Sequence, residues 1–565
     1  MFPRKIKVKR GDRIYEYVRI VENYRKNGKT YQRVIANLGS IKTLKKDMDN
    51  VIKGLARICE REDLNVENLK TKEAPRYADI LLARHLWKEL GLDKLINGYM
   101  SHTEAEMPVE LISFLMVANR LIDPKSKLAV SSWYKEKVYL PELEDTDFAP
   151  HEFYRSMDYL EKMKEDIEKD LYYEVCDLFT LKLNLVFYDT TSSYFEGEGP
   201  SLAKHGKSRD HRPDKRQIVI GLLVTDEGIP IAHKVFEGDK ADKATVIDTI
   251  NDLKKRFGLK RVIFVADRGM VSQANLDYIK EQGFSYIVTL KKRRLNEAKE
   301  AIEATFADLE EKRKNYEQEK KKGSEKEKEE EKKLVFSEYR AKDGPRCLVC
   351  LNPEKRKDDK IYREKRIEKG KRNLEKIKRS VETGQLKNRE KILKKATLAL
   401  DKTNRKYFSY SSSKDGLFFY SLVKEVLQKE ERLDGIFIIK STAFDLLPEE
   451  LIRQYKNLTG VEKAFKEIKD FLRLRPIRHH EDNRVRAHVF ICVLSYLLEK
   501  ILEKKMRQTH LMITAREALD RLDDIRVAKN EIAGKVFLCP VESQTRHKEV
   551  LSAVGIKNIP RILPT

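Results

Sequence analysis

The segment from Leu185 to Leu290 alternates between apolar strand patterns and amphipathic helix patterns, and this order constrains the fold of the chain more than any other feature. Short apolar runs bounded by turn residues predict strands, and apolar residues at three- and four-residue spacing predict helices. The order is β-β-β-α-β-α-β, with strands at 185–188, 217–224, 229–236, 261–266 and 285–290 and helices at 244–257 and 272–282. Such a succession predicts a mixed sheet with helices packed on it.

The flanking segments have different patterns. Two alternating strands surround an Asn27-Gly28 turn near the N-terminus and predict a β-hairpin. Its polar positions are rich in Lys and Arg, and two interpretations stay open: a hairpin face exposed to solvent, or an arm that contacts DNA. A charged, helix-forming stretch begins at Lys291, and the α/β pattern resumes with a strand at 435–440 and helices at about 448–472 and 483–506.

These composition changes predict six regions. They are an N-terminal β-rich basic region (1–75), a helical region expected to bind DNA (76–181), the first part of an α/β core (182–290), a charged insertion of helices and strands (291–433), the second part of the core with its catalytic helix (434–525), and a C-terminal tail (526–565).

The charge balance points to an anionic partner. Lys and Arg number 116 and Asp and Glu 92, which gives a net charge of +24. Such a surplus favours nucleic acid or an anionic membrane, and composition does not choose between them. The chain has no run of 18 apolar residues and no secretory signal pattern at its start, and its 6 cysteines do not make a disulfide scaffold. A soluble, reduced, intracellular protein without membrane contact is expected, with Cys347 and Cys350 part of a strand rather than a zinc site.

Three isolated acids suggest a metal site. Asp189 and Asp267 each follow an apolar run that predicts a strand, and open α/β sheets place their sites at the carboxyl ends of strands. In the helix predicted at 448–472, Tyr455, Glu462 and Lys469 are spaced by seven residues, so they project from one face at intervals of about 10 Å. Three carboxylates that converge there would hold Mg²⁺ or Mn²⁺, and two such ions can activate a water or hydroxyl and stabilise the leaving oxygen of a phosphodiester.

With these motifs the chain resembles the DDE transposases of the insertion-sequence-four superfamily, and within it the sixteen-thirty-four-type group. The first Asp matches Asp189 in FYDTTSSYFEG and the second matches Asp267 in FVADRGM. The signature Y-x2-R-x3-E-x6-K matches Tyr455, Glu462 and Lys469. Further similar segments are YVRIVENYRKNGKTYQRVIANLG, NRLIDPKSKLA, HGKSRDHRPDKRQIVIGLLV, VFEGDKADKAT, DGIFIIKST and LRLRPIRHHEDNRVRAHVFICVL.

The resemblance implies an RNase H-like catalytic core whose first Asp ends strand one and whose second Asp follows strand four. It implies a prokaryotic, cytoplasmic and nucleoid-associated transposase that binds the terminal inverted repeats of its element as a dimer on double-stranded DNA. Cleavage with two Mg²⁺ or Mn²⁺ ions and joining to target DNA would follow, with Asp189, Asp267 and Glu462 as the metal ligands. The alternatives are an RNase H-like nuclease or resolvase without strand transfer, and a domesticated DNA-binding protein.

The sequence departs from the family pattern at two points. Leu458 replaces the signature Arg, and the region 291–433 contains no Trp that could hold a flipped base. Six aromatic residues there are either substitutes for that Trp or core residues: Tyr407, Phe408, Tyr410, Phe418, Phe419 and Tyr420.

Several residues beside the carboxylates are expected to contact DNA phosphates. They are Tyr455, Lys469, Lys207, Arg209, His211, Arg212, Arg268, Arg473 and Arg475. Asp210 and Asp214 lie among them as counter-ions or false ligands, and Glu467 is the rival of Glu462 on another helix face. His479, His480 and His488 are predicted to be helix-end and core histidines.

Overall fold

The computed structural model describes residues 1–11, 13–59, 69–179, 185–258, 262–266, 272–292, 295–322, 334–342, 344–532 and 535–563. The chain forms two compact units. The first combines Met1–His85, Leu128–Asp147 and Leu502–Thr565, and the second combines Leu86–Lys127 and Phe148–Ile501.

The first unit begins with a three-stranded antiparallel sheet in the order β1-β2-β3, followed by a helix. The elements are β1 (Phe2–Arg10), β2 (Arg13–Lys26), β3 (Lys29–Ser40) and α1 (Ile41–Ile58). The predicted hairpin is confirmed, since Asn27 and Gly28 turn with φ of 51° and 75° between β2 and β3. Ser40 starts α1 because its side chain accepts a hydrogen bond from the backbone N–H of Thr43.

A second small sheet in this unit joins distant parts of the chain. Its strands are β16 (Lys535–Pro540), β15 (Val527–Ile532) and β4 (Lys70–Glu73), in that order. Helices α17 (Ala515–Leu522) and α18 (Thr545–Ala553) belong to the same unit.

The helical region predicted before the sheet is confirmed. It contains α2 (Ala78–Glu89), α3 (Leu92–Met100), α4 (Val109–Ile122), α5 (Lys127–Lys137) and α6 (Pro150–Phe179). Both tryptophans are buried, and the indole N–H of Trp87 donates to Glu110 at 2.7 Å. None of the helices in the described part of the chain is long and apolar enough to cross a membrane.

An eight-stranded mixed sheet dominates the second unit, in the order β10-β11-β14-β9-β8-β5-β6-β7. β5 pairs in parallel with β8 and antiparallel with β6, and β8 pairs in parallel with β9. The strands are β5 (Leu185–Tyr194), β6 (Gln217–Val224), β7 (Pro230–Glu237), β8 (Ile263–Ala266), β9 (Ser285–Thr289), β10 (Val335–Arg340), β11 (Arg346–Leu351) and β14 (Ile436–Ser441).

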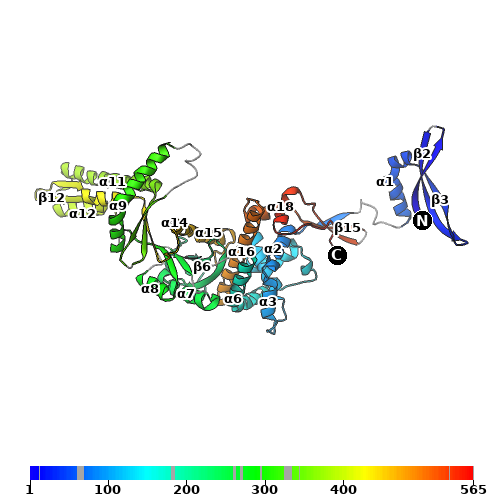
Figure 1. Cartoon of the computed structure of the whole chain (residues 1–565), viewed down its shortest axis with the longest axis horizontal. Coiled ribbons are helices and arrows are strands. Elements are labelled where there is room, and N and C mark those ends of the chain that lie inside the picture. Colours follow the sequence, from blue (N-terminus) through cyan, green and yellow to red (C-terminus); the bar gives the residue numbers. More distant parts are fainter. Residues whose placement is uncertain are drawn as a thin grey trace. The chain divides into compact units, whose positions relative to one another are not determined.

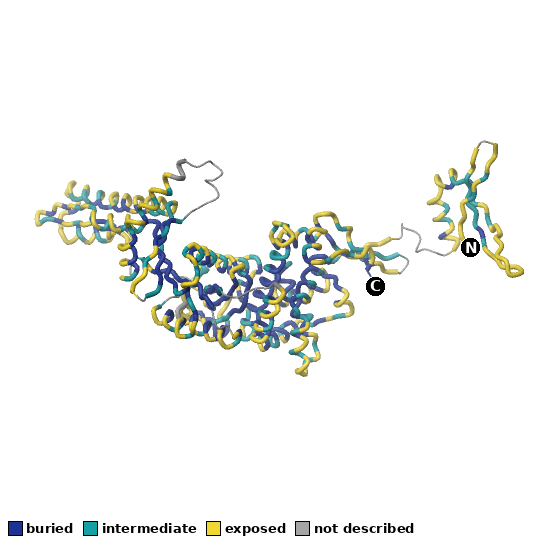
Figure 2. Tube along the Cα trace, in the orientation of Figure 1, coloured by how far each residue is buried: buried dark blue, intermediate teal, exposed yellow. Residues whose placement is uncertain are grey.

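Helices cover both faces of this sheet because its strands are apolar on both sides (Figures 1 and 2). On one face pack α7 (Asp242–Phe257) and α8 (Gln273–Glu281). On the other pack α14 (Pro448–Asn457), α15 (Thr459–Lys466) and α16 (Asp482–Gln508). The predicted order β-β-β-α-β-α-β is confirmed.

Residues 291–433 contribute both to this sheet and to a smaller core. α9 (Asn296–Lys322) packs on β10, β11 and β14, so the strand-rich part of the charged segment belongs to the large sheet. The rest surrounds a separate cluster of buried residues such as Leu374, Ile392 and Phe418. Its elements are α11 (Pro353–Glu382), α12 (Arg389–Ala399), β12 (Phe408–Ser412), β13 (Phe418–Leu422) and α13 (Lys424–Leu433).

Two predicted elements differ from the structure, one in its end and one in its continuity. β5 does not end at Asp189 but continues to Tyr194, because Thr190, Thr191, Ser192 and Ser193 are buried while they pair with β6. The helix predicted at 448–472 is divided at Leu458 and ends in a π-helical turn, Glu467–Phe471.

Candidate active site

Asp189 lies in the middle of β5, where its backbone pairs with Leu222 of β6. Side chains alternate between the two faces of a strand, so Asp189 shares a face with Phe187. Phe187 belongs to the core cluster that also contains Val461 and Phe465 of α15. Asp189 is half-buried, and its Oδ1 accepts a hydrogen bond from the backbone N–H of Thr190 at 2.7 Å. The first predicted metal ligand therefore stands on the sheet face that α15 covers.

Glu462 lies on α15, and this helix packs against β5 and β6. Val461, Ala464 and Phe465 of α15 are buried in the core, whereas Glu462 is exposed. The apolar positions thus fix the helix on the sheet and leave the carboxylate of Glu462 outside the core. One half-buried and one exposed carboxylate on elements that pack together are hard oxygen donors of the kind that Mg²⁺ and Mn²⁺ prefer.

The third predicted ligand, Asp267, and its neighbour Arg268 lie outside the described residues. The last described residue of β8 is Ala266, which pairs with Tyr188 of β5. Within the described ranges, no group of three or more His, Cys, Asp or Glu residues that could hold a metal ion is found. Asp267 lies outside these ranges, so the predicted triad stays a prediction.

The segment after Glu462 departs from a regular α-helix. The π-helical turn Glu467–Phe471 contains Lys469, and the N–H of Leu472 donates to the carbonyl of Glu467, five residues earlier. Such turns are rare and frequently occur at functional sites. The seven-residue spacing therefore does not continue as one α-helical face: Tyr455 is half-buried, Glu462 is exposed and Lys469 is buried.

Tyr455 packs inside the protein. Its ring stacks on Phe437 of β14 with centroids 6.2 Å apart, and its hydroxyl lies 3.5 Å from Oγ1 of Thr289 at the end of β9. These contacts tie α14 to the sheet, and the phosphate contact expected of Tyr455 stays a prediction.

Lys469 forms a buried ion pair with Asp210. Its Nζ lies 2.7 Å from Oδ1 of Asp210, and the side chains are 8% and 2% exposed. Nη1 of Arg475 donates to the same oxygen at 2.6 Å, and Nη2 of Arg475 donates to Asp470 at 2.6 Å. Burial lowers the pKa of Lys469, although the contact with Asp210 opposes this shift. The phosphate contact expected of Lys469 stays a prediction.

The basic loop 204–216 lies between β5 and β6 and presents part of its charge to solvent. Lys207 and His211 are exposed, and Arg209 is half-buried. Arg212 makes two hydrogen bonds to Asp214, at 2.9 and 2.8 Å, and its guanidinium lies 5.3 Å from the centre of the Tyr194 ring. The bonds from Arg212 lower the pKa of Asp214 to about 2. Asp214 is therefore a surface counter-ion, and Asp210 is a buried one.

The carbonyl groups that follow the π-helical turn are held by two buried side chains. Nη1 of Arg120 lies 3.5 and 3.1 Å from the carbonyl oxygens of Leu472 and Arg473, and Nε2 of His488 donates to that of Leu474 at 3.1 Å. The core location predicted for His488 is confirmed. The side chain of Arg473 is exposed, so it remains a candidate for phosphate contact.

The aromatic residues of the charged segment are mostly core. Tyr407, Phe408 and Phe418 are buried in the cluster between α11, α12 and the β12–β13 hairpin. Tyr410 and Tyr420 are half-buried, and their hydroxyls bond to Thr397 and Glu375. Phe419 is 56% exposed. The core interpretation is confirmed for the first three.

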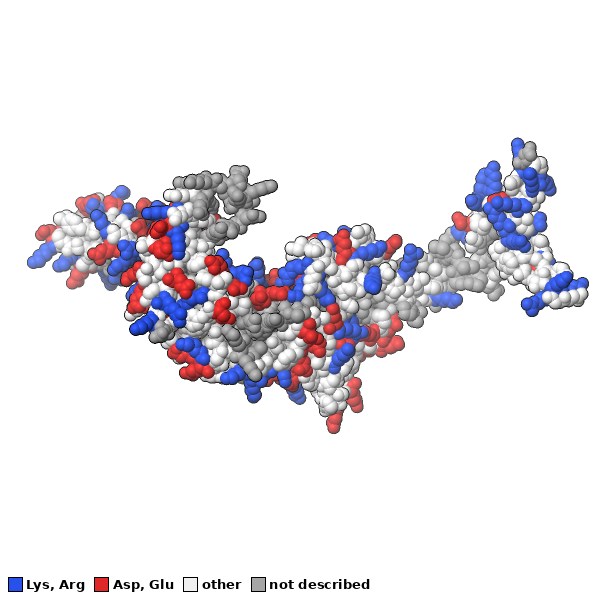
Figure 3. Space-filling model, viewed as in Figure 1, with Lys and Arg blue, Asp and Glu red and all other residues white. Residues whose placement is uncertain are grey.

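The N-terminal sheet carries basic and aromatic side chains on one face. The β1–β2 and β2–β3 registers place Lys5, Lys7 and Lys9 on the same face as the stacked pair Tyr24 and Tyr31, which are 42% and 46% exposed. Lys and Arg side chains gather over this part of the chain in Figure 3. Positive charge beside exposed aromatic rings is typical of nucleic-acid contact.

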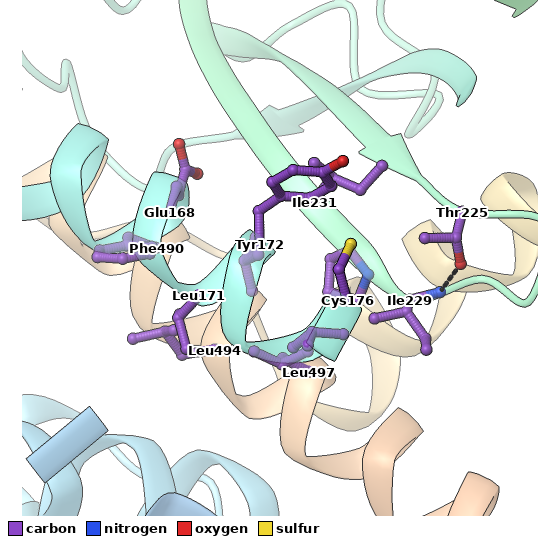
Figure 4. Close-up of a pocket in the computed structure, with 13 residues that line it drawn as sticks. Glu168, Leu171, Tyr172, Cys176, Thr225, Ile229, Ile231, Phe490, Leu494 and Leu497 are labelled. Carbon is purple, nitrogen blue, oxygen red and sulfur yellow. Dashed lines mark hydrogen bonds between the residues drawn. The ribbon is translucent and has the colours of Figure 1, made fainter. Parts of the chain in front are cut away.

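A small cavity lies between α6, β7 and α16 (Figure 4). Its volume is about 30 Å³, and most of its lining is apolar, with residues such as Leu171, Ile231 and Leu494. The space is too small for a substrate, and none of the predicted site residues lines it.

The sequence does not predict the contacts of two residues near the candidate site. Asp210 is predicted to be a counter-ion or a false ligand, and Arg120 lies within NRLIDPKSKLA without a predicted role. The only available signal was an isolated acid or base inside a motif, because both contact partners lie more than 250 residues away.

Comparison with known proteins identifies two segments. The family model described as the IS1634 family transposase N-terminal domain matches residues 3–69. The model described as the transposase DDE domain matches residues 181–498, a range that includes Asp189, Asp267 and Glu462. No curated protein matches the chain. Among solved structures, the cryo-EM structure of the piggyBac transposase synaptic complex with hairpin DNA is similar at 9% identity, over 80% of this chain and 82% of that chain, with a TM-score of 0.35.

Proposed function

This chain belongs to the DDE transposases of insertion sequences, of the IS1634 type, and we propose that Asp189, Asp267 and Glu462 form its catalytic site. The observation that carries the proposal is the placement of α15 on the sheet face where Asp189 stands. Tyr188 and Ala266 pair with each other in the adjacent parallel strands β5 and β8. Asp189 and Asp267 are the residues that follow them in the sequence. β5 and β8 are also the first and fourth strands of this region, as the family pattern requires.

The three carboxylates would hold two Mg²⁺ or Mn²⁺ ions. Such ions, when bound, lower the pKa of a water or hydroxyl and stabilise charge on the leaving oxygen of a phosphodiester. The protein's own contribution is positional. The buried face of α15 keeps Glu462 beside β5, and the hydrogen bond from the Thr190 N–H restricts the carboxylate of Asp189.

We further propose an RNase H-like core, made of 182–290 and 434–525 and interrupted by the segment 291–433. The adjacent parallel strands β5 and β8 support this assignment, as does the pairing of β14 with β9, while β10 and β11 of the interrupting segment extend the same sheet beyond β14. The helical region 76–181 would bind DNA, and 526–565 would form a C-terminal tail. Region 1–75 would recognise the ends of the element through the basic and aromatic face of β1–β3.

The DNA partner would be double-stranded, comprising the terminal inverted repeats and the target. Both ends of an element must be joined in one reaction, so we propose a dimer on DNA. Lys207, Arg209, His211, Arg212, Arg268 and Arg473 are the proposed phosphate contacts near the active site.

A strand-transfer assay tests the function. The purified protein is incubated with Mg²⁺, a labelled DNA end taken from the inverted repeats that flank the reading frame, and a supercoiled plasmid. A transposase joins the label to the plasmid, a nuclease only nicks, and a domesticated protein only binds.

Asp189→Asn, Asp267→Asn and Glu462→Gln should each abolish joining and keep end binding. Glu467→Gln is the matched control and should keep both activities. A variant of the first three that still joins the end would remove its residue from the site.

A further inference from the structure

We propose that Asp210 is a positioning residue whose buried carboxylate pairs with Lys469 and so holds the basic loop 204–216 against the end of the catalytic helix. The inference rests on the proposed function, since it concerns how that active site is held together.

The carboxylate of Asp210 accepts hydrogen bonds from two cationic side chains. A single oxygen of Asp210 accepts bonds from Nζ of Lys469 at 2.7 Å and Nη1 of Arg475 at 2.6 Å. The side chain of Asp210 is 2% exposed, and its other oxygen, Oδ2, has no hydrogen-bond partner among the described residues. Arg475, which is 30% exposed, also pairs with Asp470, which is 49% exposed. The buried set is therefore Asp210 and Lys469.

Hydrogen bonds of neighbouring residues attach both sides of the Asp210 contact to β5. The backbone N–H of Arg209, next to Asp210, donates to Oγ of Ser192 in β5 at 2.8 Å. Beyond Arg475, the N–H of Ile477 donates to the carbonyl of Tyr194 at 3.1 Å. The loop is thus attached to the strand of Asp189 on one side and to the helix segment that follows Glu462 on the other. Asp210 attaches the loop to the segment that follows Glu462. Loss of its charge should therefore make the loop that carries Lys207, His211 and Arg212 more mobile.

The chain supplies a matched control four residues away. Asp214 carries the same charge in the same loop, but it is 58% exposed and pairs with Arg212. Its replacement changes the net charge equally and leaves the buried set intact. A difference between Asp210→Asn and Asp214→Asn therefore reports on position and not on charge.

The first experiment measures the full-length protein without DNA. Hydrogen exchange of residues 204–216 should be faster in Asp210→Asn than in the wild type and unchanged in Asp214→Asn. In Asp210→Asn/Lys469→Gln the melting temperature should recover part of the loss seen in Asp210→Asn, because both buried charges are then absent. Equal exchange in Asp210→Asn and Asp214→Asn would overturn the proposal. Hydrogen exchange and melting temperature do not depend on catalysis. They therefore test the proposal even if the protein lacks the proposed transposase activity.

The second experiment measures metal-dependent cleavage of a DNA end. Asp210→Asn should lower cleavage by about 100-fold, as an active-site displacement near 1 Å would. Asp214→Asn should lower it much less. Equal cleavage by the two variants would overturn the proposal.

Discussion

Nη1 of Arg120, on α4, donates a hydrogen bond to the carbonyl oxygen of Arg473, 3.1 Å away and 353 residues later in the chain. The same nitrogen lies 3.5 Å from the carbonyl of Leu472, at the end of the π-helical turn. A cation near the C-terminal carbonyls of a helix is favoured by the helix dipole. The helical region thus stabilises the segment that follows Glu462, although it supplies none of the proposed metal ligands.

Replacement of this cation should destabilise the protein. Arg120→Met removes the donor to two carbonyl groups and is expected to lower the free energy of unfolding by about 1–3 kcal/mol. Chemical denaturation followed by circular dichroism measures the change. Arg453→Met is the control, because Arg453 is 66% exposed and pairs only with Glu450 on its own helix. Equal stability of the two variants would show that the contact contributes nothing.

Buried histidines should make stability depend on pH. Burial lowers the pKa of His233 to about 4 and that of His479 to about 3. The unfolded chain therefore binds more protons than the folded protein from pH 6.5 downward, and the free energy of unfolding should fall as pH decreases from about 6.5 to 4. Each histidine contributes a slope of up to about 1.4 kcal/mol per pH unit. His233→Gln should reduce this slope, whereas the exposed His102→Gln should not. An unchanged slope in His233→Gln would contradict the buried neutral state of His233.

The contact between Gly370 and Phe408 tests the core of the charged segment. A Cβ at Gly370 would lie 2.8 Å from Cζ of Phe408. Gly370→Ala should therefore overpack the core and cost about 1–3 kcal/mol. Gly98→Ala, in an exposed helical position with open space around it, should instead be neutral or stabilising by up to about 1 kcal/mol. Thermal unfolding of both variants gives the comparison. A stable Gly370→Ala would show that Phe408 does not pack there and would reopen its stacking role.

The lysines of β1 test the proposed DNA surface. Lys5, Lys7 and Lys9 share a face with Tyr24 and Tyr31. Their combined replacement by Gln should reduce the slope of log K against log salt by about 0.9 for each lysine that contacts a phosphate. Glu16 lies 2.7 Å from Lys5 and 3.9 Å from Lys7, so the largest reduction is expected from Lys9. The control is the combined replacement of Lys360, Lys369 and Lys378, which are exposed and ion-paired in the charged segment. The proposal fails if both triple variants change the slope equally.

Local patterns were sufficient for much of the fold. The Asn27-Gly28 turn predicted the β2–β3 hairpin, continuous apolar residues predicted β6 at its observed bounds, and helical periodicity predicted α16. In each case the signal and the structure occupy the same few residues, since turn conformation, strand alternation and helix periodicity are local properties. The isolated acids Asp189, Asp267 and Glu462 could also be chosen from the sequence.

Tertiary structure alone decided how these pieces are joined. The polar residues Thr190–Ser193 lack the apolar pattern of a buried strand, so the sequence does not predict the second half of β5. They are buried in a strand because they pair with β6. The pairing of Asp210 with Lys469 spans 259 residues, and that of Arg120 with Arg473 spans 353. No periodicity connects residues so far apart. Sequence by itself therefore determined the types of element, the basic charge and the candidate carboxylates. The ion pairs and carbonyl contacts that hold α15 and the turn after it depend on the packing of distant elements, because a buried charge is stable only where a partner reaches it.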